Sequence, residues 1–168
     1  MKEAYIGLGS NLGNRLGNLA KALALLARNS RIKLEKISPL YWTAPVGPGT
    51  QPEFLNGVVK IKTSLKPMQL LACLHRVEAK IGRIRRGKNL PRPVDLDILE
   101  HGRQRLRRPG LVIPHPRMLE RRFVLEPLAD LDPRRKLVTS RDTVKKLLSL
   151  PEISSQRVVR AAGPALRV

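Results

Sequence analysis

Apolar and polar residues recur along the chain with two periods, and each period predicts one type of element. Alternating apolar positions and short apolar runs predict strands at 4–9, 31–42, 54–63 and 94–99. Apolar residues at helical spacing predict two amphipathic helices, at 15–29 and from 64 or 67 to 82. The resulting order is β-α-β-β-α-β, which predicts an α+β, ferredoxin-like fold with an antiparallel sheet and both helices on one face.

The remaining segments predict loops and smaller elements. The stretch 43–53 is rich in proline and glycine and predicts an irregular loop. We expect the other face of the sheet, this loop and the basic loop after residue 82 to form a cleft. The smaller elements are an edge hairpin within 103–111, a helical turn at 117–122, a segment at 124–128 that packs back, and a short helix at 143–150.

The composition indicates one globular domain over residues 1–168. With 168 residues, 42% of them hydrophobic, the chain can bury a core without disulfide support. Its single cysteine, Cys73, excludes an intrachain disulfide and agrees with a reducing cytoplasm. The sequence contains no signal-peptide pattern and no apolar stretch of membrane-spanning length, so we expect a cytoplasmic protein with no membrane partner.

The formal net charge of +20 favours anionic partners such as nucleotides or nucleic acid. The basic residues are spread over the whole chain, however, and aromatic residues make up only 3% of it, which is poor material for stacking bases. The alternative from another functional class is a nucleic-acid-binding module on a ferredoxin-like sheet. The sequence lacks the basic and aromatic signature of RNA readers with this fold, so we expect no specific nucleic-acid partner.

The segment 82–97 carries the strongest chemical signal. Five cations without an intervening acid extend from Arg83 to Arg92, and Asp95 and Asp97 follow one residue apart. Because side chains at i and i+2 of a strand share a face, the two carboxylates point the same way. Such a pair suits Mg²⁺, which completes its shell with water and substrate phosphates, and the arginines suit a polyphosphate. The alternative is a solvated basic loop followed by a strand with two exposed acids.

The Gly-Ser-Asn cluster within 9–15 predicts a turn into the first helix, with Asn11 or Asn14 as its N-cap. The cluster lacks the Lys-Ser/Thr pair of a P-loop and the spacing of the dinucleotide fingerprint. We therefore favour a structural turn over a phosphate-binding loop.

Six motifs occur in one order along the chain. They are YIGLGSNLG at 5–13, YWTAPVG at 41–47, QPEFLN at 51–56, GRIR at 82–85, PRPVDLD at 91–97, and PHPR at 114–117 with Arg121 and FVL at 123–125. Over about residues 4–133, this series resembles the 6-hydroxymethyl-7,8-dihydropterin pyrophosphokinase family, with near-family spacing. The agreement of several independent motifs is more specific than any one of them.

The resemblance implies transfer of pyrophosphate from ATP to the hydroxymethyl group of a dihydropterin in folate biosynthesis, with release of AMP. It also implies a ferredoxin-like fold, two Mg²⁺ ions, and loops that close over ATP and the pterin. By this likeness, the site residues are Asp95 and Asp97 for the metals, Arg83 and Arg92 for charge stabilisation, and Arg85, His115 and Arg121 for ATP. The pterin contacts are Phe54 and Phe123 on its two faces, with Thr43, Pro45, Val46 and Asn56 at its edge.

Alternatives remain for some of these residues. Phe54 and Phe123 are also explained by ordinary core packing, and His115 by a loop histidine bonded to backbone. The sequence departs from the family at Asn89 and Leu90, where many members have Trp-Gly, in a loop that is one residue shorter. This change leaves an inactive relative as a further alternative. The stretch 103–108 is unusually basic for the family and has no functional explanation. Residues 134–168 lie outside the resemblance, and we expect a monomer.

Overall fold

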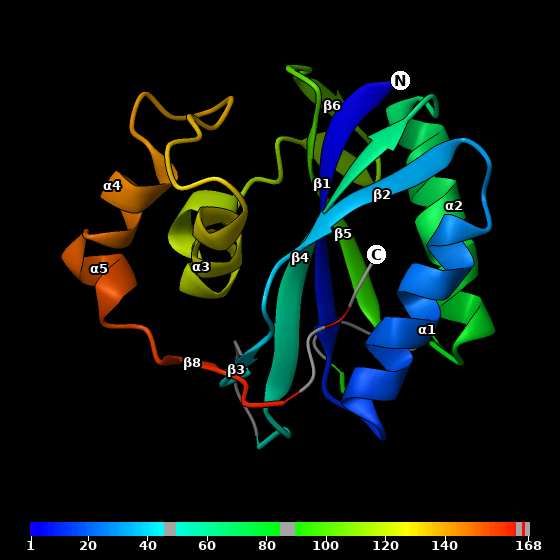
Figure 1. The fold of residues 1–168 in the computed structure, drawn as a ribbon, viewed down its shortest axis with the longest axis horizontal. Helices are drawn as coiled ribbons and strands as arrows, with labels where there is room; N and C mark the ends of the chain where they lie inside the picture. Colours follow the sequence, from blue (N-terminus) through cyan, green and yellow to red (C-terminus); the bar gives the residue numbers. More distant parts are fainter. Residues whose placement is uncertain (46–49, 85–89, 164–165, 167–168) are drawn as a thin grey trace.

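The computed structural model describes residues 1–45, 50–84, 90–163 and 166. At its centre is an antiparallel sheet with helices on both faces (Figure 1). The sheet strands are β1 (Lys2–Ser10), β2 (Ile32–Ile37), β3 (Tyr41–Thr43), β4 (Phe54–Thr63), β5 (Asp95–His101) and β8 (Val158–Arg160). The α-helices in the described residues are α1 (Arg15–Ala27), α2 (Pro67–Lys80), α3 (Arg122–Leu131), α4 (Val144–Leu148) and α5 (Pro151–Ser154).

Strands β1 and β4 are central in the sheet, which runs β5-β1-β4-β3-β8 with β2 also paired to β4. These pairings are antiparallel. When β2 and β3 are taken as one interrupted strand, the chain follows the split β-α-β arrangement of ferredoxin-like folds. The fold class predicted from the sequence is therefore confirmed.

The predicted strand at 31–42 is interrupted, so the expectation of one continuous strand was wrong. Ser38 lies between β2 and β3, and its N–H donates to Val58 O at 2.9 Å. The Ser38 hydroxyl accepts from the Val58 N–H at 2.9 Å and donates to Pro39 O at 2.7 Å. Pro39 has no N–H to donate, so the chain leaves the ladder here and pairs with β4 again at Tyr41.

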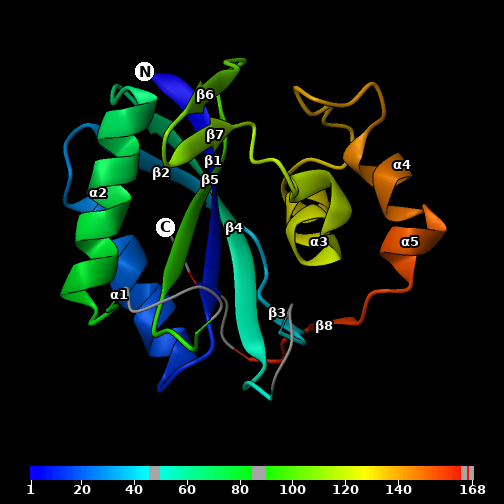
Figure 2. The ribbon, with the colours of Figure 1, turned by 180° about the vertical axis from the view of Figure 1, so that it is seen from behind.

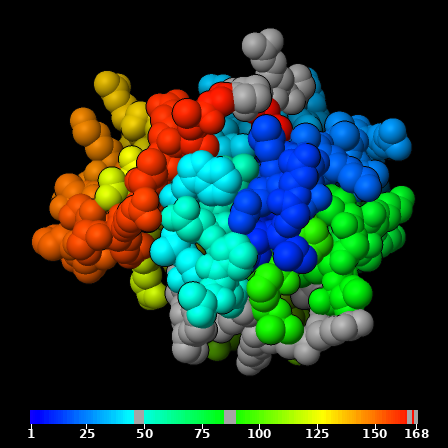
Figure 3. Space-filling view, turned by 90° about the horizontal axis from the view of Figure 1, so that it is seen from below, coloured from blue at the N-terminus to red at the C-terminus, as the bar shows by residue number. Residues whose placement is uncertain are grey.

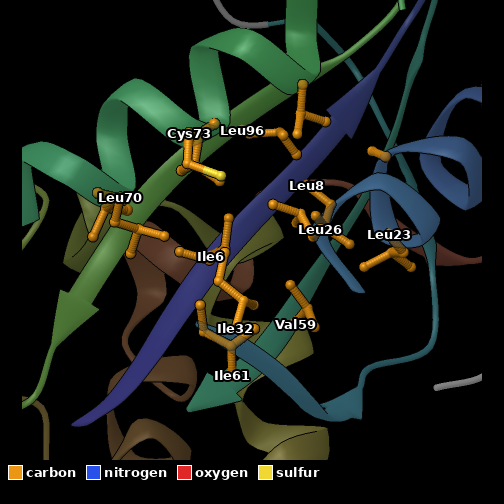
Figure 4. Packing of buried hydrophobic residues seen from close by; sticks show 14 of the residues in the cluster. Ile6, Leu8, Leu23, Leu26, Ile32, Val59, Ile61, Leu70, Cys73 and Leu96 are labelled. Carbon is orange, nitrogen blue, oxygen red and sulfur yellow. The ribbon is translucent and has the colours of Figure 1, made fainter. Parts of the chain in front are cut away.

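Helices α1 and α2 cover one face of the sheet and enclose the larger core (Figures 1 and 4). Alternate strand residues point into this core, as Ile6 and Leu8 of β1 do in Figure 4. Leu23 and Leu26 of α1 and Leu70 of α2 meet them from the helices. Complete burial of one such side chain contributes roughly 1.5–3 kcal/mol, so both predicted helices are held mainly by their apolar faces.

The ends of these two helices follow local signals in the sequence. Asn14 is the N-cap of α1, and its Oδ1 accepts from the Gly17 N–H at 2.9 Å. Pro67 occupies the first turn of α2, where its missing N–H costs no helical hydrogen bond. Gly82 follows α2 with a φ of 98°, a conformation that glycine adopts without strain.

Helix α3 packs against part of the opposite face of the sheet, so the expectation that this face is free was wrong there (Figure 2). Tyr5, Val58 and Leu99 point away from α1 and α2 and pack with Leu125 of α3. The sequence pattern did not predict this helix because Pro127 lies inside it, and a proline normally ends a helix. The molecule thus has a second, smaller core.

The C-terminal part of the chain returns to the sheet. Strand β8 pairs with β3, and the Ala161 N–H donates to Leu40 O at 2.8 Å. A hairpin forms as predicted but extends past the expected 103–111: it consists of β6 (Leu106–Arg108) and β7 (Leu111–Ile113), joined through Gly110 with a φ of 78°. A 3₁₀ helix, η1 (Met118–Glu120), forms the predicted turn, and α4 lies within the predicted short helix. Among the described residues, no helix has the length and apolar character needed to cross a membrane.

Candidate active site

Asp95 and Asp97 of β5 line a cavity of about 720 Å³. In the β1–β5 pairing they lie opposite Gly9 and Gly7, which carry no side chain over this face. A Cβ atom at Gly9 would lie only 2.8 Å from Asn56 Oδ1, so a larger residue would displace Asn56. The two glycines therefore leave space beside both carboxylates.

Most of the site residues expected from the sequence border this one cavity. The lining includes Thr43, Phe54, Asn56, Arg83, Arg92, Asp95, Asp97, His115, Arg121 and Phe123. Pro45 is described but is not one of the lining residues. Val46 and Arg85, and Asn89 of the altered loop, lie outside the described residues. Leu90 is 48% exposed and lies at the cavity.

Two arginines hold the Asp95 carboxylate. Arg83 Nη1 donates to Asp95 Oδ1, and Arg92 Nη2 donates to Oδ2 at 2.6 Å. Burial alone would raise the pKa of Asp95, but the nearby guanidiniums of Arg92 and Arg83 outweigh it and hold this pKa below its ordinary value. Asp95 is thus ionised, and both its oxygens are engaged.

Glu78, at the end of α2, positions one of these arginines. Its side chain is buried, and Oε1 lies 2.5 Å from Arg83 Nη1. The same oxygen accepts from the N–H of Leu96 at 2.9 Å, between the two aspartates of β5. Glu78 therefore fixes Arg83 and the β5 backbone relative to each other. Sequence reasoning missed this role, because Glu78 looked like one more residue on the side of the helix.

Asp97 is in the opposite situation from Asp95. Within the described residues it has no ion pair, and its side chain is open to the cavity. Loss of hydration in the cavity, with the negative charges of Asp95 and Glu78, raises the pKa of Asp97 to about 6. A cation beside Asp97 would relieve this repulsion.

The donor atoms fit a magnesium ion that is shared with a substrate. Among the described residues, no cluster of three or more histidine, cysteine, aspartate or glutamate side chains could hold a metal alone. Asp95 and Asp97 offer carboxylate oxygens, and Mg²⁺ commonly takes one or two carboxylates together with water and phosphate oxygens. The residues present therefore fit Mg²⁺ with a phosphate-bearing ligand better than an all-protein metal cage.

The two phenylalanines expected to hold a flat ligand are half-buried at the cavity. Phe54 belongs to neither core, whereas Phe123 packs against the edge of the smaller one. Each has a guanidinium over its ring: Arg92 at 5.2 Å from the Phe54 centroid and Arg121 at 5.3 Å from the Phe123 centroid. Ordinary core packing therefore does not account for Phe54, and accounts only in part for Phe123.

Asn56 and Thr43 lie side by side in neighbouring strands at the cavity. Asn56 Nδ2 donates to Thr43 Oγ1 at 2.6 Å, and both residues are buried. This bond fixes the amide orientation of Asn56. An asparagine offers both a donor and an acceptor to a ligand edge.

His115 combines a cavity position with backbone bonding. Its backbone N–H donates to Leu99 O at 2.9 Å, and its ring Nδ1 accepts from the Arg117 backbone N–H at 3.2 Å. Burial, and then the positive charges of Arg121 and Arg117, lower the pKa of His115 to about 4. The imidazole is therefore neutral near pH 7. Arg117 also lines the cavity and was not expected from the sequence.

Asn11 was expected only as a possible cap, but Asn14 takes that role. Asn11 is buried, and its side chain bonds to the backbone of Arg92 and to Gln51, which lines the cavity. The segment 9–15 thus starts the helix, as the preferred interpretation of a structural turn predicted. That interpretation did not include the bonds of Asn11 to residues at the cavity. Its neighbourhood in a family-like motif was the available signal.

The profile of the 7,8-dihydro-6-hydroxymethylpterin-pyrophosphokinase (HPPK) family matches residues 5–133, which is more than half of the chain. The chain belongs to this family. The HPPK match agrees with the resemblance seen in the sequence. It also makes this protein an enzyme, a pyrophosphokinase of the transferase class.

Curated relatives of HPPK type cover most of the chain. The 2-amino-4-hydroxy-6-hydroxymethyldihydropteridine pyrophosphokinase of Bacillus subtilis is 47% identical over 128 residues, which are 76% of this chain and 77% of the relative. The protein of the same name from Pseudomonas aeruginosa is 41% identical over 151 residues, which are 90% and 93% of the two chains.

A longer protein shares the HPPK fold. The crystal structure of Plasmodium falciparum HPPK-DHPS A437G with STZ-DHP matches with a TM-score of 0.70 at 17% identity. The match covers 87% of this chain and 44% of that chain, so this protein spans less than half of the solved structure. At this identity the likeness supports the fold alone.

Proposed function

We propose that this protein transfers pyrophosphate from ATP to the hydroxymethyl group of 6-hydroxymethyl-7,8-dihydropterin, with Mg²⁺, and releases AMP. The observation that carries the proposal is one cavity lined by both β5 carboxylates, Arg83, Arg92 and two phenylalanines. The names of the relatives from Bacillus subtilis and Pseudomonas aeruginosa support the choice of a hydroxymethyldihydropteridine as acceptor.

Asp95 and Asp97 would hold two Mg²⁺ ions together with phosphate oxygens and water. When bound there, Mg²⁺ would supply positive charge that neutralises the phosphates. Arg83 and Arg92 occupy both oxygens of Asp95 in the present structure. Because guanidinium pairs bidentately with phosphate, ATP phosphates would draw these arginines from Asp95 and free its oxygens.

The reaction is a substitution at the β-phosphorus of ATP. The hydroxyl oxygen of the pterin attacks this phosphorus and loses its proton, and the bond from the β-phosphorus to the α–β bridging oxygen breaks. AMP leaves with the bridging oxygen. Arg83 and Arg92 would stabilise the charge that develops there, since catalysis of phosphoryl transfer rests mainly on positioning and electrostatics.

Phe54 and Phe123 would flank the pterin ring, and each aromatic pair gains about 0.5–1.5 kcal/mol beyond burial. Asn56, oriented by Thr43, would bond to the edge of the ring. His115 and Arg121 would contact ATP, where the depressed pKa of His115 keeps the ring neutral. The contacts of Pro45, Val46 and Arg85 stay predictions from the sequence. So do the single domain over 1–168, the monomeric state, the cytoplasmic location and the lack of a specific nucleic-acid partner.

The direct test is the identity of the nucleotide product. Purified protein is incubated with ATP, with and without Mg²⁺ and 6-hydroxymethyl-7,8-dihydropterin, and AMP and ADP are separated by anion-exchange chromatography. We expect AMP only when both additions are present. Formation of ADP would contradict attack at the β-phosphorus. Absence of any product, from protein that binds ATP, would favour an inactive relative with a changed loop around Leu90.

A further inference from the structure

Asn11, directly after β1, joins two segments that border the cavity. Its side chain is 0% exposed. On one side, Asn11 Oδ1 accepts from the Arg92 N–H at 2.8 Å, and the Asn11 N–H donates to Arg92 O at 3.2 Å. Both backbone polar groups of Arg92 are therefore held by one residue.

The other half of the same amide holds the chain that leads into β4. Asn11 Nδ2 donates to Gln51 Oε1 at 3.2 Å and lies 3.4 Å from Pro52 O. Phe54, the first residue of β4, follows two residues later. Figure 3 views this end of the molecule, where blue, cyan and green parts of the chain adjoin one another.

The position of Arg92 matters because its guanidinium reaches two parts of the cavity. It lies 2.6 Å from Asp95 Oδ2 and 5.2 Å from the centroid of the Phe54 ring. Asn11 fixes the backbone of Arg92. It also fixes the chain at Gln51 and Pro52, which leads to Phe54. We propose that Asn11 is a positioning residue that places Arg92 over both Asp95 and Phe54. This inference rests on the proposed function.

Only an amide side chain satisfies both sides of this contact. A carboxylate in place of Asn11 would still accept from Arg92 but would face Pro52 O without a donor. An alanine would lose the side-chain bonds on both sides and keep only the main-chain bond from its N–H to Arg92 O. The substitution removes no apolar contact of the two hydrophobic cores, so we expect the variant to fold. The expected defect is a displaced guanidinium.

A double-mutant cycle separates positioning of Arg92 from a general structural role. AMP formation is measured for the wild type, Asn11→Ala, Arg92→Ala and the double variant, in single-turnover experiments where rates are low. We expect Asn11→Ala to lower kcat about 10–100-fold, the size of effect that a displacement near 1 Å can have. In the Arg92→Ala background, the same change should alter kcat less than about 2-fold, because the group it positions is gone. Equal losses in both backgrounds, or no loss in the wild type, would overturn the proposal.

Asn29→Ala is the matched control. Asn29 is a partly buried asparagine. Like Asn11, it accepts from one backbone N–H, that of Arg31, and donates to another side chain, Cys73 Sγ, but it does not line the cavity beside Asp95 and Asp97. We expect its kcat to equal that of the wild type. A loss of kcat in Asn29→Ala as large as that in Asn11→Ala would overturn the assignment, since the loss of any amide contact would then lower kcat.

Hydrogen exchange gives a readout that does not depend on turnover. Pro91 and Pro93 have no N–H groups, so exchange within 91–93 reports on the Arg92 amide alone. In ligand-free protein we expect this amide to be protected in the wild type and in Asn29→Ala, and to exchange at least about tenfold faster in Asn11→Ala. If the wild type forms no AMP, the proposed function fails, and hydrogen exchange alone then tests whether Asn11 holds the Arg92 backbone. Equal exchange in the wild type and Asn11→Ala would overturn the inference.

Discussion

At the scale of single residues, Asp95 and Asp97 share one strand face but carry their charges under opposite conditions. The guanidiniums of Arg92 and Arg83 compensate Asp95, and its pKa stays low. Asp97 faces the cavity beside two negative charges, and its pKa rises to about 6. Sites that bind cations or phosphates often keep such an uncompensated group at the expense of stability.

The raised pKa of Asp97 predicts how an amide at this position changes stability. In the folded state Asp97 titrates near 6, above its ordinary value of 3.8. The folded state therefore holds the proton more tightly than the unfolded state, and the carboxylate lowers stability increasingly as the pH rises from about 4 to 6. Asp97→Asn should raise Tm at pH 8 in chelator-treated protein, and this gain should vanish by pH 4.

Thermal unfolding at both pH values tests this prediction. Asp142→Asn is the control, because Asp142 is an exposed acid that pairs with Lys146 away from the cavity. An equal Tm difference for Asp97→Asn at pH 8 and pH 4 would argue against the uncompensated charge.

At the scale of elements, the C-terminal strand completes the sheet beyond β3. The β3–β8 register pairs Trp42 with Val159, and the Ala161 N–H bonds to Leu40 O. In an antiparallel pair, successive N–H groups alternate between facing the partner and facing away. The N–H of Ala161 therefore faces β3, and that of Arg160 faces away.

Two proline substitutions test whether β8 is a real part of the sheet. Ala161→Pro should lower the free energy of unfolding by about 1–3 kcal/mol more than Arg160→Pro, because it removes a hydrogen bond to the buried Leu40 carbonyl. Urea unfolding of both variants measures the difference. Equal stabilities would mean that the β3–β8 pairing contributes little in solution.

An element could be predicted from the sequence where its apolar residues follow a single period from end to end. The helices α1 and α2 and the strands β1, β4 and β5 follow from such patterns, because each has one face on the main core. Helix α3 was missed because of Pro127, and the break at Ser38 was missed because its signal is one proline within an alternating run. β8 was missed because three residues at an edge carry no recognisable period.

At the scale of the whole molecule, two cores on opposite faces of one sheet leave a cavity bordered by residues from Gly7 to Val124. Motif residues such as Asp95 and Phe54 were predictable, because the sequence carries them in family-like stretches. The role of Glu78 was not, because it depends on partners that the fold brings together. Asn11 and Arg117 also lie in family-like stretches, but these stretches alone did not give their roles. Asn11 and Arg92, for example, are 81 residues apart in sequence.

The cavity also gives the net charge of +20 a local meaning. Among the residues that the structure describes, Arg83, Arg92, Arg117 and Arg121 line it together with only two carboxylates. Such an excess of cations suits the phosphates of a nucleotide, and the metals would add to it.

The measurement that tests the central claim most directly is AMP formation by Asp97→Asn beside the wild type and Asp142→Asn, with saturating ATP, Mg²⁺ and pterin. We expect Asp142→Asn to match the wild type and Asp97→Asn to lose about 10³-fold or more in kcat, since several kcal/mol of charge stabilisation depend on this carboxylate. Together with a higher Tm of Asp97→Asn at pH 8, this loss of kcat would show that the Asp97 carboxylate supports activity and lowers stability. AMP formation by Asp97→Asn at the wild-type rate would contradict the claim that the β5 carboxylates support pyrophosphate transfer.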